Sequence, residues 1–160
     1  MKASLATTNE RCKGGQFVLG AMSLPGNPYD GHTLGAQIDQ VARVAGRKPA
    51  RAYVDRGYRG HGVVREGLGV HVSHTRGIAS ATIRRELRRR NAIEPVIGHM
   101  NQDGHLERNG LKGAKGDIVN VLLCANGHNL RLLLAQLRTF LLLILAAILF
   151  PSSAGHMRVA

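Results

Sequence analysis

The sequence predicts an α/β domain in which a mixed sheet is flanked by helices. Three observations support this prediction. Short β-capable segments bounded by glycines and prolines occur near the N-terminus and again within residues 51–77. An amphipathic helical pattern separates them, and long helical patterns follow towards the C-terminus. With 160 residues, 44% of them hydrophobic, the chain has the size and apolar content of a single domain.

The first two strands are expected to form a hairpin. Residues 3–9 and 16–24 are β-capable and lie on either side of a charged turn that contains glycine. Residues 34–46 then repeat apolar side chains at helical spacing up to a glycine, which predicts an amphipathic helix. Residues 51–55 and 69–77 predict two further strands. Strands on both sides of a helix favour a mixed sheet.

The chain is strongly basic. It has 22 lysines and arginines against 10 aspartates and glutamates, which gives a formal net charge of +12. Such an excess predicts a polyanionic partner, either nucleic acid or an anionic membrane surface, and nucleic acid is the commoner of the two. Aromatic residues make up only 4% of the chain and tryptophan is absent. Binding by base stacking on an aromatic platform is therefore not expected.

The densest positive charge lies in a predicted helix that starts at about residue 79. Its helical wheel places Ile83 and Leu87 on one side, with Arg84 and Arg88 on the opposite side. A helix face of this kind predicts contacts with DNA phosphates, and a simply solvated face is the alternative. The arginines predicted to contact DNA are Arg84, Arg85, Arg88, Arg89 and Arg90.

A single carboxylate, Glu94, stands among apolar residues near the end of this helical pattern. On the wheel it lies on the apolar edge with Ile97, and it precedes Pro95, which is expected to kink or restart the helix. A carboxylate in apolar surroundings needs a partner, because burying an unpaired charge is costly. An ion pair with Arg90, four residues earlier, and ligation of a metal ion are both open at this point.

A second carboxylate, Asp55, ends a predicted strand and enters a glycine-rich turn. It is either a ligand group at the carboxyl end of the sheet or a turn residue that caps its own backbone. Two carboxylates beside a basic helix would suit a divalent cation held against a phosphodiester, although this chemistry normally uses a third acid. Asp30 is the remaining candidate, but it stands just before a predicted helix, where we expect it to be the N-cap.

The C-terminal part is apolar. Residues 118–150 predict one or two long helices, and residues 151–160 predict a loose tail. Arg131 and Arg138 interrupt the apolar run, whereas a membrane span needs about 20 apolar residues. We therefore expect a helix that is buried or faces a partner, and membrane association is the lesser alternative. The two cysteines, Cys12 and Cys124, lie far apart and form no C-x-x-C pair, which favours a reducing cytoplasm, and the N-terminus has no signal-peptide pattern.

Four motifs together carry a resemblance to a known family. They are LPGNPYDGHTL, YVDRGYRGH, RRRNAIEPVIGHM with NQDGHLERN, and GDIVNVLLCANGHNLR. In this order and spacing they resemble the C-terminal part of the catalytic domain of bacterial insertion-sequence transposases of the DDE type, in the insertion-sequence five group. The resemblance extends from about Ala3 to about Leu137. Residues 1–137 are thus expected to form a partial catalytic domain, and residues 138–160 an apolar helix and tail.

The resemblance implies an RNase H-like fold and two magnesium or manganese ions held by two aspartates and a glutamate. By position, Asp55 resembles the second aspartate and Glu94 the final glutamate. Arg90 matches a family arginine four residues before that glutamate, whereas Leu87 and Asn101 replace a family tyrosine and lysine. Asn101 is accordingly expected to contact DNA more weakly than the lysine, because its amide carries no charge.

In the family, the first catalytic aspartate lies on a strand that would precede Met1. The resemblance therefore implies an incomplete RNase H-like sheet with two of the three metal ligands. The expected function is that of a truncated transposase, related to metal-dependent DNA cleavage and strand transfer, with little activity alone. The expected partners are transposon-end and target DNA, a second copy or a full-length transposase, at the nucleoid of a bacterial cytoplasm. The alternative is a fragment that regulates transposition by binding DNA or transposase without catalysis.

Overall fold

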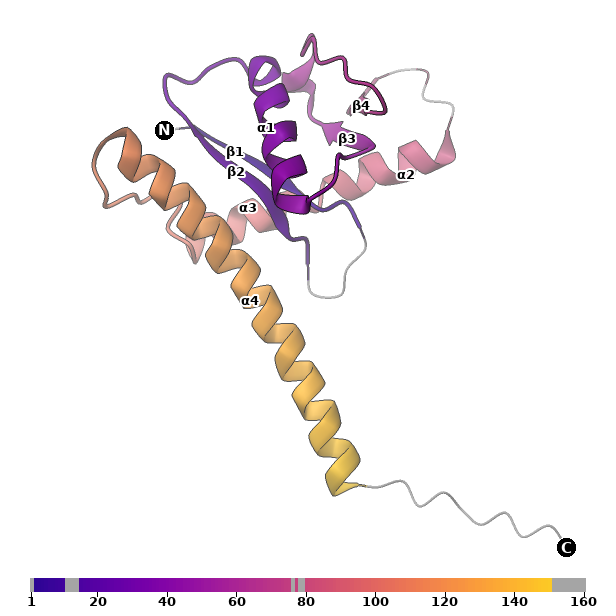
Figure 1. The fold of residues 1–160 in the computed structure, drawn as a ribbon, viewed down its shortest axis with the longest axis vertical. Coiled ribbons are helices and arrows are strands. Elements are labelled where there is room, and N and C mark those ends of the chain that lie inside the picture. The colour runs from indigo at the N-terminus through magenta and orange to yellow at the C-terminus, as the bar shows by residue number, and fades with distance from the viewer. Residues whose placement is uncertain (1, 11–14, 76, 78–79, 151–160) are drawn as a thin grey trace, which may run out of the picture.

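The computed structural model describes residues 2–10, 15–75, 77 and 80–150. A folded α/β part comes first, and a long C-terminal helix projects from it (Figure 1). The α/β class predicted from the sequence is confirmed. The elements are β1 (Lys2–Thr7), β2 (Val18–Leu24), α1 (Asp30–Ala45), β3 (Arg51–Val54), the short 3-10 helix η1 (Arg56–Tyr58), β4 (Gly69–Val72), α2 (Ala81–Arg90), α3 (Ile93–Gln102) and α4 (Gly113–Leu149).

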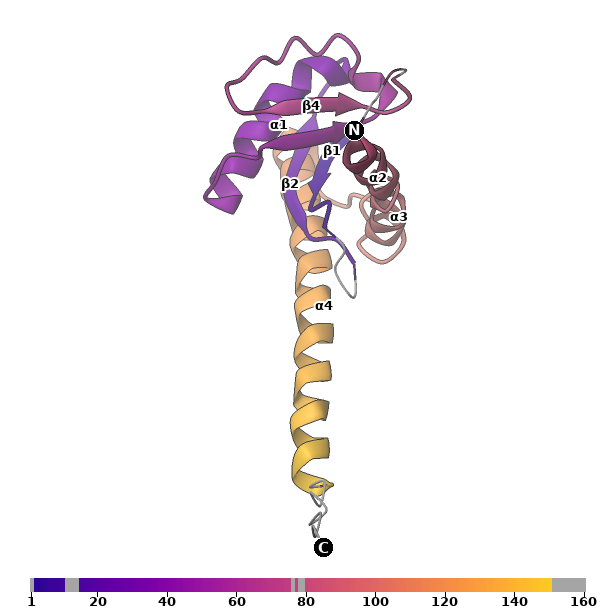
Figure 2. The ribbon, with the colours of Figure 1, turned by 90° about the vertical axis from the view of Figure 1, so that its right-hand side faces the viewer.

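The strands form two separate pairs rather than the single mixed sheet that we expected. β1 and β2 are antiparallel, with Leu5 opposite Ala21, which confirms the predicted hairpin. Most of its turn falls outside the described residues. β3 and β4 are parallel, with Tyr53 opposite His71. The two pairs run in different directions (Figure 2), and no strand of the described residues joins them.

Two apolar clusters hold the α/β part together. The first joins β2 to α3 and α4, and at its centre Met100 and Val121 are fully buried. The second packs α1 against β3 and consists of Leu34, Ile38 and Val54 with partly buried neighbours. Burying a side chain of this size stabilises a fold by about 1.5–3 kcal/mol. The clusters therefore fix α1 against one strand pair and α4 against the other.

Polar contacts anchor the first half of α4 to the start of β2. The Asn129 side chain accepts a hydrogen bond from the Val18 N–H at 2.8 Å and donates one to the Val18 carbonyl at 2.8 Å. The ring of His128 is buried, and its Nε2 lies 3.0 Å from the Gln16 carbonyl oxygen. Both main-chain groups of Val18 are thus satisfied by α4, which removes the cost of burying them unpaired.

The arginine-rich segment forms two helices. We expected the helix to kink or restart at Pro95; it restarts, but two residues earlier, because α2 ends at Arg90 and α3 starts at Ile93. Pro95 lies in the first turn of α3, where a missing backbone N–H breaks no helical hydrogen bond. The break therefore comes before Glu94, and this carboxylate belongs to the start of a new helix.

Beyond Leu132, α4 continues alone. It is one unbroken helix of 37 residues, so the predicted boundary after residue 137 falls inside it. The predicted tail from Pro151 lies outside the described residues. By length and composition α4 could cross a membrane, a test that core helices of soluble proteins also pass, and none of its most apolar stretch is buried. The expected burial is thus found in the first half of α4 and is absent, within the described chain, from its most apolar stretch, whose partner-facing role remains a prediction.

Candidate nucleic-acid interface

Asp55 lies at the carboxyl end of β3 and is held from three directions. Its Oδ1 accepts hydrogen bonds from the Arg56 backbone N–H at 2.7 Å and from the Ser73 hydroxyl at 3.0 Å. Its Oδ2 lies 3.5 Å from Nη2 of Arg90. The Arg56 amide, then Ser73 and Arg90, lower the pKa of the Asp55 carboxyl. The side chain is therefore an ionised turn cap that also ties β3 to β4 and to α2.

Glu94 is exposed in the first turn of α3. The apolar surroundings inferred from its sequence neighbours are therefore wrong. The alternative of an ion pair with Arg90 is also wrong, because Arg90 points to Asp55 and the helix break removes the one-turn relation between positions 90 and 94. A carboxylate in a first helical turn is stabilised by the helix dipole, which is a sufficient structural reason for Glu94.

The arrangement of donor side chains does not match the predicted metal site. Among the residues that the structure describes, no three His, Cys, Asp or Glu side chains are grouped closely enough to hold a metal ion. One oxygen of Asp55 already accepts two hydrogen bonds, and the Arg90 guanidinium lies beside the other. A divalent cation would have to displace that guanidinium. The donor set as arranged does not fit a pair of magnesium or manganese ions.

Asp30 lies near Asp55 in space, but it has another role than the one we expected. It is the first residue of α1 and makes no capping hydrogen bond, while Tyr29 occupies the N-cap position. Instead, its Oδ1 forms an ion pair with Nζ of Lys2 at 2.6 Å. A Cβ atom on Gly57 would come within 2.6 Å of Oδ2 of Asp30, so this carboxylate packs directly on the turn that follows Asp55.

The acid inside the arginine run, Glu86, docks α2 onto β3. Its carboxylate accepts a hydrogen bond from the Tyr53 hydroxyl and forms an ion pair with Arg51 at 3.0 Å. The hydrogen bond from Tyr53, and then the charge of Arg51, lower the pKa of the Glu86 carboxyl. Our sequence reasoning missed this contact, although the one acid among the arginines at positions 84–90 was a visible signal.

Glu86 faces β3, and the arginines of α2 occupy the rest of the surface of this helix. Arg84, Arg85 and Arg88 are exposed, whereas Arg89 and Arg90 are half-buried. Within the described ranges, the salt bridges of α2 involve only Glu86 and Arg90. The three exposed guanidinium groups are thus free of intramolecular carboxylate partners there, and this is the arrangement that phosphate contacts require.

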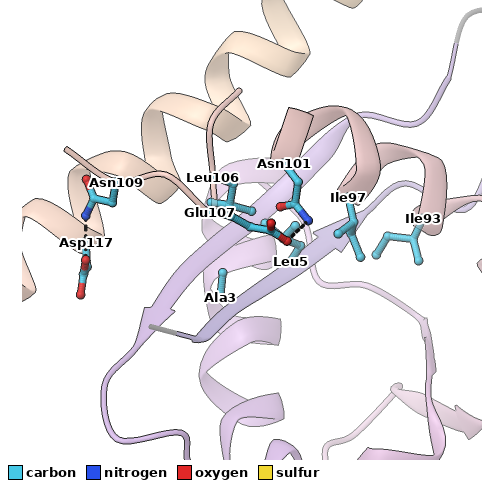
Figure 3. Close-up of a pocket in the computed structure, with 9 residues that line it drawn as sticks. All are labelled: Ala3, Leu5, Ile93, Ile97, Asn101, Leu106, Glu107, Asn109 and Asp117. Carbon is cyan, nitrogen blue, oxygen red and sulfur yellow. Dashed lines mark hydrogen bonds between the residues drawn. The ribbon is translucent and has the colours of Figure 1, made fainter. Parts of the chain in front are cut away.

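Asn101, the predicted DNA contact in α3, takes part in a hydrogen bond within the protein. Its Nδ2 donates to Oε1 of Glu107 at 2.7 Å. The pair lies at a cavity of about 570 Å³ that is also lined by Leu5 of β1 and Leu106 (Figure 3). The structure therefore gives Asn101 a partner on the following loop, and its role towards DNA stays a prediction.

Comparisons with known proteins add no family assignment. The chain matches no protein-family model, no curated protein and no solved structure. The α/β class therefore stands on the structure itself, whereas the transposase resemblance stands on the four sequence motifs.

Proposed function

We propose that this chain binds DNA phosphates through the exposed arginines of α2, as part of a transposase-like domain. The single observation that supports this most strongly is the face formed by Arg84, Arg85 and Arg88. The three side chains are exposed on one helix, and the nearby acid Glu86 is engaged by β3. Arginine forks without carboxylate partners suit bidentate phosphate contacts, which do not read base sequence.

The RNase H-like part of the proposal is supported by the order of elements. An antiparallel pair, a helix, a parallel pair and a basic helix follow one another along the chain. Asp55 stands at the carboxyl end of β3, and Glu94 lies in the first turn of α3 after the arginine helix. These are the positions at which the two residues resemble the second aspartate and the final glutamate of the family. Arg90, between them in sequence, contacts Asp55.

We propose no catalytic step for the described residues. Arg90 stands where a cation would have to lie beside Asp55, and among the described residues no three His, Cys, Asp or Glu side chains are grouped closely enough to hold a metal ion. Of the two functions that the sequence left open, we therefore favour a fragment that acts by binding DNA or transposase over one that cleaves strands alone. Its setting, a bacterial nucleoid, belongs to the same proposal.

The test is the salt dependence of binding to a short duplex of arbitrary sequence, measured by fluorescence anisotropy. Replacement of Arg84, Arg85 and Arg88 by glutamine should lower the slope of log affinity against log salt by about 2.7, because each lost phosphate contact removes about 0.9. The affinity at low salt should fall together with the slope, and it should fall equally for unrelated sequences.

A matched variant removes the same charge elsewhere. Arg43, Lys48 and Arg108 are exposed outside α2, and their joint replacement by glutamine conserves the net charge of the test variant. This control should change the slope by less than about 1. If both triple variants reduce the slope equally, DNA is attracted by diffuse charge and the α2 interface is wrong.

A further inference from the structure

A groove separates the two strand pairs. It has a volume of about 510 Å³, and it is lined by all residues of β3 and by those of β1 other than Ser4. Ile38 of α1 and Ile93 and Ile97 of α3 line it as well. Figure 2 shows α1 on one side of the strands and α2 and α3 on the other. Two walls of the groove are thus formed by β1 and β3, and the helix walls carry apolar side chains together with Asp30, Gln37 and Arg90.

Both strand edges at this groove lack a partner strand. β1 pairs with β2 alone and β3 with β4 alone in the described chain. The carbonyls of Ala50 and Val54 accept hydrogen bonds from β4 and its ends, from Gly69 and Ser73, each at 2.9 Å. Because main-chain groups alternate sides along a strand, those of Arg51 and Tyr53 point away from β4. An open edge of this kind is a template for pairing with another strand.

Two buried polar atoms at the groove also lack partners. Gln37 is only 4% exposed, and its Oε1 has no hydrogen-bond donor among the described residues. Oδ1 of Asn9 is buried and unpaired in the same way. Both residues line the groove. Buried acceptors without donors are costly, so these atoms indicate that a group able to donate hydrogen bonds belongs there.

We propose that the groove binds an extended segment of a separate polypeptide, which pairs as a strand with β3 and bridges towards β1. Neighbouring strands in a sheet differ in direction by about 20–25°, so one added strand would take up part of the difference between the two pairs. A second copy is a poorer occupant, because every strand of the described chain already belongs to a pair.

The helices on both sides define the chemistry of the bound segment. A strand covered on both faces is a nearly continuous run of Val, Ile or Leu, unlike the alternating pattern of a half-exposed strand. The lengths of β3 and β1, four and six residues, set the length of the run. Strand binding uses the inner edges of the sheets and does not depend on the proposed DNA contact of α2.

The test uses the full chain without DNA and the synthetic peptide Asp-Ser-Val-Ile-Val-Ile-Val-Ser-Asp. Amide hydrogen exchange is measured residue by residue while the peptide is titrated. At saturation, exchange of the Arg51 and Tyr53 amides, and of amides along β1, should slow by at least about tenfold, as expected for newly paired strand edges. Protection confined to α4, or no protection of β3, would overturn the proposal.

A control peptide replaces the central valine with proline and keeps charge and apolar content nearly the same. Proline removes an N–H and is excluded from central strands, so this peptide should bind at least about tenfold more weakly. Equal binding by the two peptides would mean that the groove binds apolar peptides non-specifically, without strand pairing. Size-exclusion chromatography with light scattering is run in parallel, and a dimer that protects β1 and β3 without peptide would assign the groove to a second copy.

A pair of protein variants locates the contact. Arg51→Pro removes a main-chain N–H that points away from β4, at the first residue of β3, where proline is tolerated. Arg51→Ala keeps that N–H, and both variants lose the ion pair with Glu86. The proline variant should bind the peptide about fivefold more weakly than the alanine variant, which is the effect of one hydrogen bond. Equal affinities would place the peptide elsewhere.

Discussion

Similar apolar side chains are buried in the α/β part and exposed in the second half of α4. In the α/β part, apolar residues gather in two buried clusters, and Asp30, Asp39, Asp55 and Glu86 each have an arginine or lysine partner. In the second half of α4, apolar side chains are more frequent but remain exposed: Leu143 is 65% and Ile148 68% exposed. Local helix propensity is satisfied in both regions, and only the presence of a facing element separates them.

The transition between the two regions lies at Asn129. Up to that residue α4 packs on β2, Arg131 and Leu132 still contact the α/β part, and further along the described chain supplies no element to cover the helix (Figure 1). Contiguous exposed apolar surface of this extent marks a site of association, because monomeric soluble proteins rarely expose it. The comparison can therefore be tested by making equivalent substitutions on either side of Asn129.

The largest expected effect comes from truncating one apolar side chain in each region. Met100→Ala should reduce the free energy of unfolding by about 2–5 kcal/mol, because it opens a cavity in a fully buried site. Leu143→Ala should change it by less than about 0.5 kcal/mol, because that side chain is already exposed. Denaturant unfolding measures both. An equally large loss for Leu143→Ala would show that the second half of α4 is buried in an assembly.

A smaller loss is expected at the transition itself. Asn129→Ala leaves the N–H and carbonyl of Val18 without their side-chain partner and should cost about 1–3 kcal/mol. Hydrogen exchange of the Val18 amide should accelerate in the same variant. Thr139→Ala, which loses only a hydrogen bond to its own helix, is the matched control and should be nearly neutral. Equal losses would indicate that α4 is held by something other than this anchor.

The bare half of α4 is expected to mediate self-association. Leu134, Leu137, Leu141 and Leu145 line one shallow groove along the helix. Leu141→Glu should weaken association at least about tenfold, because a leucine covered in an interface contributes about 1.5–3 kcal/mol. Light scattering over a concentration series measures this effect. Gln136→Glu adds the same charge at an exposed position outside this groove and serves as the control. A wild-type chain that stays monomeric throughout would contradict the expectation.

Liposome flotation separates self-association from membrane insertion. The uninterrupted apolar run Phe140–Phe150 is 11 residues long, or about 16 Å of helix, against about 30 Å of hydrocarbon core. Extending the span upstream would place Arg138 inside the bilayer, which costs about 2.5–3.5 kcal/mol. We therefore expect the chain to stay with the soluble fraction. Flotation that resists high salt would instead assign α4 to the membrane.

The smallest effect concerns the docking of α2. Glu86→Gln should destabilise the protein by about 1 kcal/mol at pH 7, because it weakens the contacts to Tyr53 and Arg51. The folded-state pKa of Glu86 is lowered from 4.5, so this stabilisation is present above that value and is lost as the pH falls through the lowered pKa. The difference in the free energy of unfolding between the wild type and Glu86→Gln should disappear over that range. Glu66→Gln, at an exposed site, should show no such pH dependence.

The errors of sequence interpretation are concentrated around Glu94. Its neighbours Ile93 and Val96 suggested apolar surroundings, but adjacent positions on a helix point in different directions, and only Val96 is fully buried. Pro95 was expected to kink or restart the helix at its own position, whereas the break comes before it and the first turn of the new helix accommodates the proline without loss. The pairing of Arg90 with Asp55 joins residues 35 positions apart, a contact that no helical or strand periodicity encodes.

The sequence by itself determined the α/β class, the hairpin, the helix at residues 34–46 and the basic surface, because periodicity, turn residues and charge act over a few neighbouring positions. The tertiary structure decided the partners. In the tertiary structure the strands form two pairs around a groove, and half of α4 is uncovered. Glu86 contacts β3, and Asp55 forms an ion pair with Arg90. Each of these outcomes depends on which distant element lies opposite, and hence on the packing of the whole chain.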